Sequence, residues 1–179
     1  MPEGWPYSRA YEQIERAAHI IADEVKKYGA ICVIEPINPG ECNVIYYVTD
    51  GAMVSASIGR PEIRTLADFF HMSLQNEPLS HLVKAKAYLA HTHTSGPERY
   101  FPGPGQAWDQ KAFLQGLRRA EYDSRLSIES WTLRPGTSLG SEATAGVAYL
   151  RKLWNEVNSE PLDEVKDAPN YQAWPDTPR

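Results

Sequence analysis

Short apolar runs separated by tight turns are the feature that most constrains the fold of this chain. Two β-branched and aromatic runs, 30–34 and 43–49, flank Pro39-Gly40, and Asp50-Gly51 leads into a third run at 52–58. Pro-Gly and Asp-Gly pairs between such runs are typical of the turns that join antiparallel strands. The pattern therefore predicts a meander of three antiparallel strands.

The rest of the chain alternates between helical and extended patterns. Apolar residues at helical spacing predict helices over 9–27, 66–74, 108–122 and 143–157. Further apolar runs predict a strand within 81–90, which delivers the His pair, and another strand over 126–133. This order is typical of the α+β class, so we expect a mainly antiparallel (mixed) sheet flanked by helices in three layers. We expect one domain over 8–158 and a loosely ordered, Pro-rich tail over 159–179.

Charge and hydropathy exclude several classes of partner. The net charge of −5 gives no support for a surface that binds nucleic acid or anionic membranes. No apolar stretch is long enough to span a bilayer, and 1–6 lacks the regions of a signal peptide. Cys32 and Cys42 are expected to lie too far apart for a disulfide. We therefore expect a cytoplasmic protein, with secretion as an effector without a signal peptide as the alternative. The oligomeric state is not indicated.

His91 and His93 follow an apolar run and are separated by a single residue. Alternate residues of a strand point to the same side, so both imidazoles can bind one cation. Asp109 lies beyond a loop rich in Gly and Pro and would be a third ligand. Three protein ligands and one water are typical of catalytic zinc, so the pattern predicts a Zn²⁺ site.

Each part of this pattern also has a simpler explanation. A His-x-His sequence at a strand end arises by chance in many proteins. Asp109 begins a predicted helix, where an acidic residue commonly caps the first turn. The combination of strand, His pair, loop and helix-start acid is more specific than any one part.

That combination resembles the JAMM motif of the JAB/MPN metalloprotease family, H-x-H-P-x6-S-x2-D. The order of the surrounding elements is also similar, from Tyr11 to Gly136. The resemblance implies a JAB/MPN-like fold with His91, His93 and Asp109 as metal ligands. Thr94 replaces the motif proline, and the longer loop before the Asp is similar to that of JAB-like domains attached to bacterial toxins. Gln106 takes the place of the family's serine, whose oxyanion-stabilising role an amide can share.

The general base of the family is a glutamate shortly before the first strand, and here that register falls on Lys26 or Lys27. A lysine cannot replace the carboxylate without a large fall in its pKa. Glu24 on the preceding helix and Glu35 at the far end of the first strand are candidate replacements, and Glu41 after the turn is a third.

The resemblance implies a zinc metallopeptidase or isopeptidase in which a metal-activated water cleaves an amide bond of a peptide or protein substrate. Because of the two lysines, a catalytically inactive JAB-like scaffold module is the first alternative. A metallophosphoesterase or amidohydrolase is the second, since some of these enzymes also carry His-x-His.

Overall fold

The computed structural model of the protein describes residues 1–161. The elements, in chain order, are α1 (Tyr7–Lys26), β1 (Cys32–Ile34), α2 (Val48–Ile58), β2 (Ile63–Asp68), α3 (Phe69–Leu74), α4 (Ser80–Lys84), β3 (Leu89–Thr94), the 3-10 helix η1 (Pro97–Arg99), α5 (Gln110–Arg119), β4 (Leu126–Ile128) and α6 (Leu139–Ser159). At least one helix thus lies between each strand and the next along the chain. Among the described helices, none is long and apolar enough to cross a membrane.

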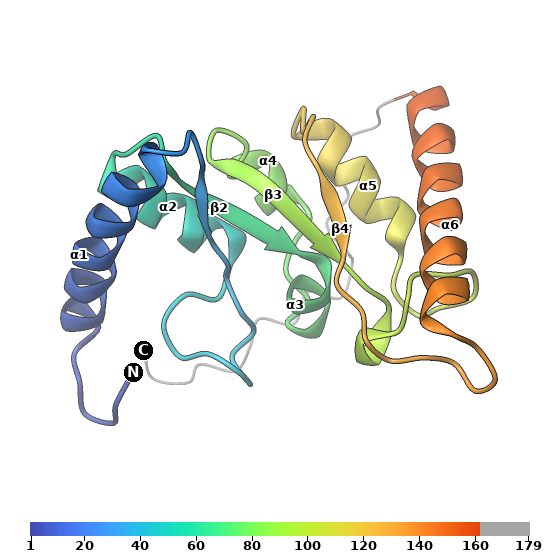
Figure 1. The fold of residues 1–179 in the computed structure, drawn as a ribbon, viewed down its shortest axis with the longest axis horizontal. Coiled ribbons are helices and arrows are strands. Elements are labelled where there is room, and N and C mark those ends of the chain that lie inside the picture. Colours follow the sequence, from blue (N-terminus) through green and yellow to red (C-terminus); the bar gives the residue numbers. More distant parts are fainter. Residues whose placement is uncertain (162–179) are drawn as a thin grey trace.

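The four strands form one parallel sheet in the order β1-β2-β3-β4. Figure 1 shows α2, α4 and α5 behind the sheet, with α1 beyond β1 at one end and α6 beyond β4 at the other. The larger apolar core lies around Phe113 and includes residues of the helices from α2 through α6 and of the sheet. A smaller core lies around Ala22 and includes residues of α1, α2 and β2. Parallel strands need crossover connections, which the helices supply.

The prediction of an antiparallel meander in a JAB/MPN-like α+β sheet is wrong. The chain does turn at Pro39-Gly40, but residues 43–47 then form a loop, and 48–58 form α2 instead of two strands. Asp50 is the third helical residue, and its side chain accepts hydrogen bonds from the backbone N–H groups of Tyr46 and Tyr47. The Asp-Gly pair therefore starts a helix and does not form a hairpin turn.

Gly51 explains why this pair lies in a helix. A Cβ at this position would approach Thr65 Oγ1 to 2.2 Å and Pro36 Cγ to 2.9 Å. The glycine thus allows α2 to lie directly against β2 and the loop after β1. Its role is a close helix-to-sheet contact, which a local turn rule cannot distinguish from a hairpin.

The structure also differs from the predicted bounds of one helix and one strand. The helix expected over 66–74 begins only at Phe69, because Asp68 ends β2 and its carboxylate accepts a hydrogen bond from Phe70 N. Of 81–90, where the sequence predicts a strand, the first residues belong to α4, and β3 begins only at Leu89. The helices predicted at 9–27, 108–122 and 143–157 are confirmed as α1, α5 and α6. Of the predicted tail, residues 162–179 lie outside the described residues.

The contact at Gly51 can be tested by adding one methyl group. Gly51→Ala should lower the free energy of unfolding by about 1–3 kcal/mol, because α2 or Thr65 must move to admit the Cβ. Urea unfolding followed by circular dichroism measures the change. Gly140→Ala is the matched control in α6, where a Cβ meets nothing within 4 Å. Equal effects of the two substitutions would contradict the proposed close contact.

Candidate metal centre

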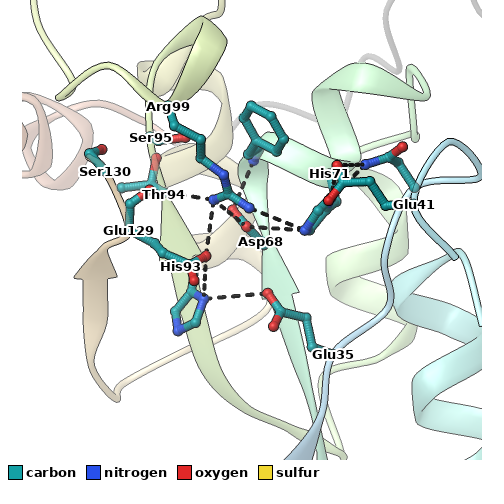
Figure 2. A network of polar contacts seen from close by, with 12 residues as sticks. Glu35, Glu41, Asp68, His71, His93, Thr94, Ser95, Arg99, Glu129 and Ser130 are labelled. Atoms are coloured by element: carbon teal, nitrogen blue, oxygen red, sulfur yellow. Dashed lines mark hydrogen bonds and ion pairs between the residues drawn. The ribbon is translucent and has the colours of Figure 1, made fainter. Parts of the chain in front are cut away.

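Four side chains with metal-binding atoms meet at the carboxyl-terminal edge of the sheet, one from each strand (Figure 2). Glu35 directly follows β1, Asp68 ends β2, His93 is next to last in β3, and Glu129 directly follows β4. One ligand atom from each lies within 4.8 Å of the other three. In parallel α/β sheets this is the edge at which ligands bind.

The register of the sheet brings these residues together. Asp68 pairs with His93 across β2 and β3, and His93 pairs with Ser127 across β3 and β4. The Glu129 backbone N–H then donates to Thr94 O at 2.9 Å, which extends the β3–β4 ladder past the end of β4. Main-chain hydrogen bonds thus determine the positions of the site residues.

His93 lies between the carboxylates of the two outer strands. Its Nδ1 is 3.4 Å from Glu35 Oε1 and 3.2 Å from Glu129 Oε2. Asp68 is almost completely buried and divides its two oxygens between two tasks. Oδ1 accepts the hydrogen bond from Phe70 N that caps α3, and Oδ2 is left to face the site.

Two buried carboxylate oxygens of this group have ion-pair partners but no hydrogen bond among the described residues: Glu35 Oε1 lies 3.4 Å from His93 Nδ1, and Asp68 Oδ2 lies 2.7 Å from Arg99 Nη1. Buried anionic oxygens are costly unless they are paired or bind a metal. Three carboxylates and the guanidinium of Arg99 leave two net negative charges when His93 is neutral. A divalent cation would balance that charge, so the four residues fit a metal ion.

Arg99 forms the other side of the site. Its Nη1 lies 2.7 Å from Asp68 Oδ2 and 3.0 Å from Glu129 Oε2. The guanidinium also lies over the rings of Phe70 and Trp131, at 3.9 Å and 5.1 Å from their centroids. Arg99 is thus held in place both by charge and by stacking.

The backbone that carries Arg99 is strained. Glu98 and Arg99 have φ of 54° and 60°, in the left-handed region that residues other than glycine seldom adopt. Thr132 stabilises this segment, since its Oγ1 donates to Glu98 O at 2.7 Å and its N–H donates to Arg99 O at 3.2 Å. Such strain costs about 1–3 kcal/mol per residue and is concentrated at functional sites.

A second polar group continues from Arg99 to the rim of the site. Arg99 Nη2 lies 3.2 Å from His71 Nε2, and Asn38 Nδ2 lies 2.8 Å from His71 Nδ1. Asn38 Nδ2 also donates to Glu41 Oε1 at 2.7 Å. Figure 2 shows this row of side chains running from the carboxylates toward the loop after β1.

The pKa values of the two histidines of β3 are shifted in opposite directions. The carboxylate of Glu35 raises the pKa of His93 above its ordinary value, with further help from Glu129 and Asp68 and against the effect of burial. Burial lowers the pKa of His91, and the neighbouring His93 adds to the effect. His93 therefore retains a proton to higher pH than His91 does.

Comparison with known proteins places the chain in a family. The model for xylose isomerase-like TIM barrels matches residues 1–153. The chain belongs to the xylose isomerase-like TIM-barrel family. D-psicose 3-epimerase from Ruminiclostridium cellulolyticum is 21% identical over 163 residues, which cover 90% of this chain and 50% of that relative.

Solved structures show the same fold. A 3-keto-D-glucoside 4-epimerase from E. coli aligns with a TM-score of 0.75 and 20% identity, over 85% of this chain and 57% of the other. An L-ribulose 3-epimerase aligns with a TM-score of 0.76 and 18% identity, over 89% and 58%. The chain thus spans about half the length of the curated relative that it matches and little more than half of these structures.

These findings overturn the resemblance to JAB/MPN metalloproteases. The prediction of a zinc metallopeptidase is wrong, as is that of an inactive JAB-like module, because the family is a parallel barrel fold. The prediction of a peptide or protein substrate is also wrong, since the similar proteins are named as sugar epimerases. The His-x-His pattern is real, but it stands on a parallel strand in another architecture.

The residues predicted as metal ligands lie in different places. His93 is in the group of four, whereas His91 lies two residues earlier on β3 with its Nε2 3.0 Å from Ser127 Oγ. Asp109 is the N-cap of α5, and its carboxylate accepts a hydrogen bond from Ala112 N. The group of four therefore contains His93 but neither His91 nor Asp109.

Of the predicted catalytic residues, one lies at the site and two lie elsewhere. Glu35 lies beside His93. Gln106 uses both of its polar ends within its own loop, where Nε2 donates to Phe101 O and Oε1 accepts from Gly103 N. Glu24 is exposed and pairs with Lys27 at the end of α1, which leads into the opposite, amino-terminal edge of the sheet.

Asp68 and Glu129 are the site residues that sequence reasoning missed, along with Arg99 and His71. The available signal was positional, because each ligand stands at the end of a short apolar run, once per βαβ unit of roughly 30 residues. Only a parallel sheet brings such run ends to one edge, whereas the turn pattern predicts an antiparallel sheet. The recurring ligand position therefore carries no signal when the strands are taken as antiparallel.

The two candidate ligand sets can be separated by single substitutions. Glu129→Gln should raise the Kd for Mn²⁺ by more than about tenfold, because loss of even an outer partner of a metal site costs that much. Asp109→Ser should leave the Kd unchanged, since serine also caps a helix and Asp109 is outside the group. Isothermal titration calorimetry measures both values. Loss of binding in Asp109→Ser alone would favour the set of His91, His93 and Asp109.

Metal affinity should depend on pH through His93. Only the neutral imidazole binds a metal, and Glu35 raises the pKa of His93, so protons compete up to a pH above the ordinary 6.5. The Mn²⁺ association constant should therefore rise by about tenfold per pH unit up to that pKa and then level off. Mn²⁺ titrations between pH 6 and pH 8 test this. As the control, NMR of the imidazole protons in the metal-free protein gives the pKa of His93. A flat profile would contradict it.

Proposed function

We propose that this chain carries the metal centre and the acid–base carboxylates of an epimerase or isomerase that acts on a small keto sugar. The observation that carries the proposal is that Glu35 and Glu129 approach His93 from the two outer strands. They therefore stand on opposite sides of the space between β1 and β4. The names of the similar proteins support the substrate class, as each denotes epimerisation of a sugar.

The chemistry of such an epimerisation needs two proton-transfer groups. A hydrogen on carbon next to a ketone is acidic enough to be removed by a well-placed base, and inversion requires that a proton return to the opposite face. One of Glu35 and Glu129 would take the proton at a carboxylate oxygen. The other would deliver a proton from the far side. The roles exchange for the reverse reaction.

A bound divalent cation would supply electrophilic stabilisation of the sugar's carbonyl oxygen. Glu35, Asp68, His93 and Glu129 would hold it. Three carboxylates and one imidazole are a predominantly hard donor set, which suits Mn²⁺ or Mg²⁺ better than the nitrogen and sulfur sets typical of zinc. We therefore propose Mn²⁺ in preference to the Zn²⁺ expected from the His pair.

Arg99 and His71 would bind and orient the sugar. Both are buried, they contact each other, and each lies beside Asp68. A guanidinium held by stacking donates hydrogen bonds in fixed directions, which suits hydroxyl and carbonyl oxygens. Asn38 and Glu41 at the rim extend the row of polar groups along which a short polyol could lie.

Isotope exchange in D₂O tests the proposal directly. With saturating MnCl₂ and D-psicose, D-fructose or L-ribulose, NMR should show deuterium entering at the carbon next to the ketone together with the epimer. Glu35→Gln and Glu129→Gln should each reduce epimerisation by about 10²–10⁴-fold, the usual contribution of a general acid or base. Each variant keeps one base, which can remove the proton from one face of the carbon. Hydrogen–deuterium exchange without inversion should therefore survive for one epimer only.

Glu24→Gln is the matched control, since that residue is exposed on α1 and pairs with Lys27. It should leave both rates unchanged. Metal content is measured for every variant, so that loss of a ligand is distinguished from loss of a base. Full epimerisation by both site variants with metal bound would exclude these carboxylates as the acid and base.

A further inference from the structure

The buried side chain of Asn38, in the loop after β1, lies against His71 of α3. Its Oδ1 accepts a hydrogen bond from Gly40 N at 3.0 Å, and its Nδ2 donates to Glu41 Oε1 at 2.7 Å. These two contacts determine which end of the amide is which. With oxygen and nitrogen exchanged, an N–H would face the Gly40 N–H, and an oxygen would face a carboxylate. The second N–H of Nδ2, 2.8 Å from His71 Nδ1, therefore points at the ring as a donor.

His71 thus faces a hydrogen-bond donor at each ring nitrogen. Arg99 Nη2, which can only donate, lies 3.2 Å from His71 Nε2, and Figure 2 shows the ring between Arg99 and Glu41. A neutral imidazole accepts at one nitrogen and carries its proton on the other, so both donors cannot form hydrogen bonds. The contact from Asn38 is shorter, and the turn at Gly40 fixes its direction. We therefore place the acceptor at Nδ1 and the proton at Nε2.

The resulting Nε2–H of His71 has no acceptor among the described residues. Asp68 Oδ2 lies 3.7 Å from Nε2, which is too long for a hydrogen bond. The other tautomer would be no better, because an Nδ1–H would point at the amide N–H of Asn38, with Glu41 Oε1 4.0 Å away. Since His71 is buried, its free Nε2–H is costly until an acceptor enters the site.

We propose that Asn38 is a positioning residue that holds His71 as the Nε2–H tautomer, so that His71 donates a hydrogen bond to an oxygen of the sugar. This inference rests on the proposed function and deepens it, because it assigns the direction of one hydrogen bond in the site. Both N–H groups of the Asn38 amide are already used, by Glu41 and His71. Asn38 therefore acts on the sugar through His71.

The tautomer determines what the sugar must offer at this point. His71 Nε2–H and the Nη2 of Arg99 lie side by side, and both are donors. The atom that binds between them must therefore be an acceptor, such as a carbonyl or hydroxyl oxygen. In the other tautomer, Nε2 would itself accept from Arg99, and the sugar would lose its hydrogen bond to His71.

NMR of the ring nitrogens tests the tautomer without any need for turnover. In isotope-labelled protein with Mg²⁺ in mildly alkaline buffer, long-range proton–nitrogen spectra should show His71 with Nδ1 unprotonated and Nε2 protonated. His71→Gln assigns the signals by their loss. Addition of D-psicose should shift the Nε2 signal far more than the Nδ1 signal, because the sugar oxygen accepts at Nε2. A protonated Nδ1 in the unaltered chain, in either the other tautomer or an imidazolium, would overturn the proposal.

Substitution of Asn38 tests whether this residue sets the tautomer. Asn38→Asp keeps the oxygen that accepts from Gly40 N and replaces the donor with an acceptor, so His71 Nδ1 should become protonated. Asn38→Ala removes the donor altogether. Arg99 then donates to Nε2, and the proton should again move to Nδ1. Asn38→Ala should also lower kcat/KM for epimerisation by about tenfold, the value of one hydrogen bond.

Asn43→Ala is the matched control, because Asn43 is an exposed amide in the same loop whose Nδ2 donates to Met1 O. It should change neither the His71 signals nor kcat/KM. Circular dichroism shows whether each variant is folded, and the spectrum of the unaltered chain decides the tautomer even if an Asn38 variant does not fold.

The outcomes separate this inference from the proposed function. An active chain whose His71 tautomer is the same in both Asn38 variants, or whose Nε2 signal does not respond to the sugar, would overturn the inference alone. A chain with the expected tautomer that neither binds nor epimerises D-psicose, D-fructose or L-ribulose would contradict the proposed function. It would also remove the role of the Nε2–H toward a sugar, but not the control of the tautomer by Asn38.

Discussion

Parallel alignment of the four strands is the constraint on which the rest of this structure depends. Because every strand ends at the same edge, the residues that end or follow β1, β2, β3 and β4 meet there, although they are far apart in the chain. Main-chain hydrogen bonds between strands determine their relative heights. Glu35, Asp68, His93 and Glu129 therefore owe their proximity to backbone register and not to local sequence.

The electrostatics of this edge explain its unusual local features. Three carboxylates near one imidazole would repel one another in a poorly solvated site. Arg99 offsets part of that charge through its contacts with Asp68 and Glu129. Holding Arg99 there requires two consecutive left-handed residues and stacking against Phe70 and Trp131. The strain in the loop after β3 is thus explained by the charge that the loop places in the site.

Local sequence signals predicted some elements well and others badly, for identifiable reasons. The helices α1, α5 and α6 have clear helical spacing of apolar residues, and the position of Asp109 before such a pattern indicates the helix cap that the structure shows. In contrast, 48–58 is rich in small and β-branched residues because α2 lies closely against the sheet at Gly51. The same composition is typical of a strand, so that segment could not be assigned from its own residues.

The sequence by itself determined the amphipathic helices, the strand that carries His93 and the identity of the ionisable residues available for chemistry. The tertiary structure decided which of those residues act together. Asp109 is near the His pair in the chain, whereas Asp68 and Glu129 are near His93 in space. The physical reason is that strand direction is a property of pairing between distant segments, and that direction alone decides which strand ends share an edge.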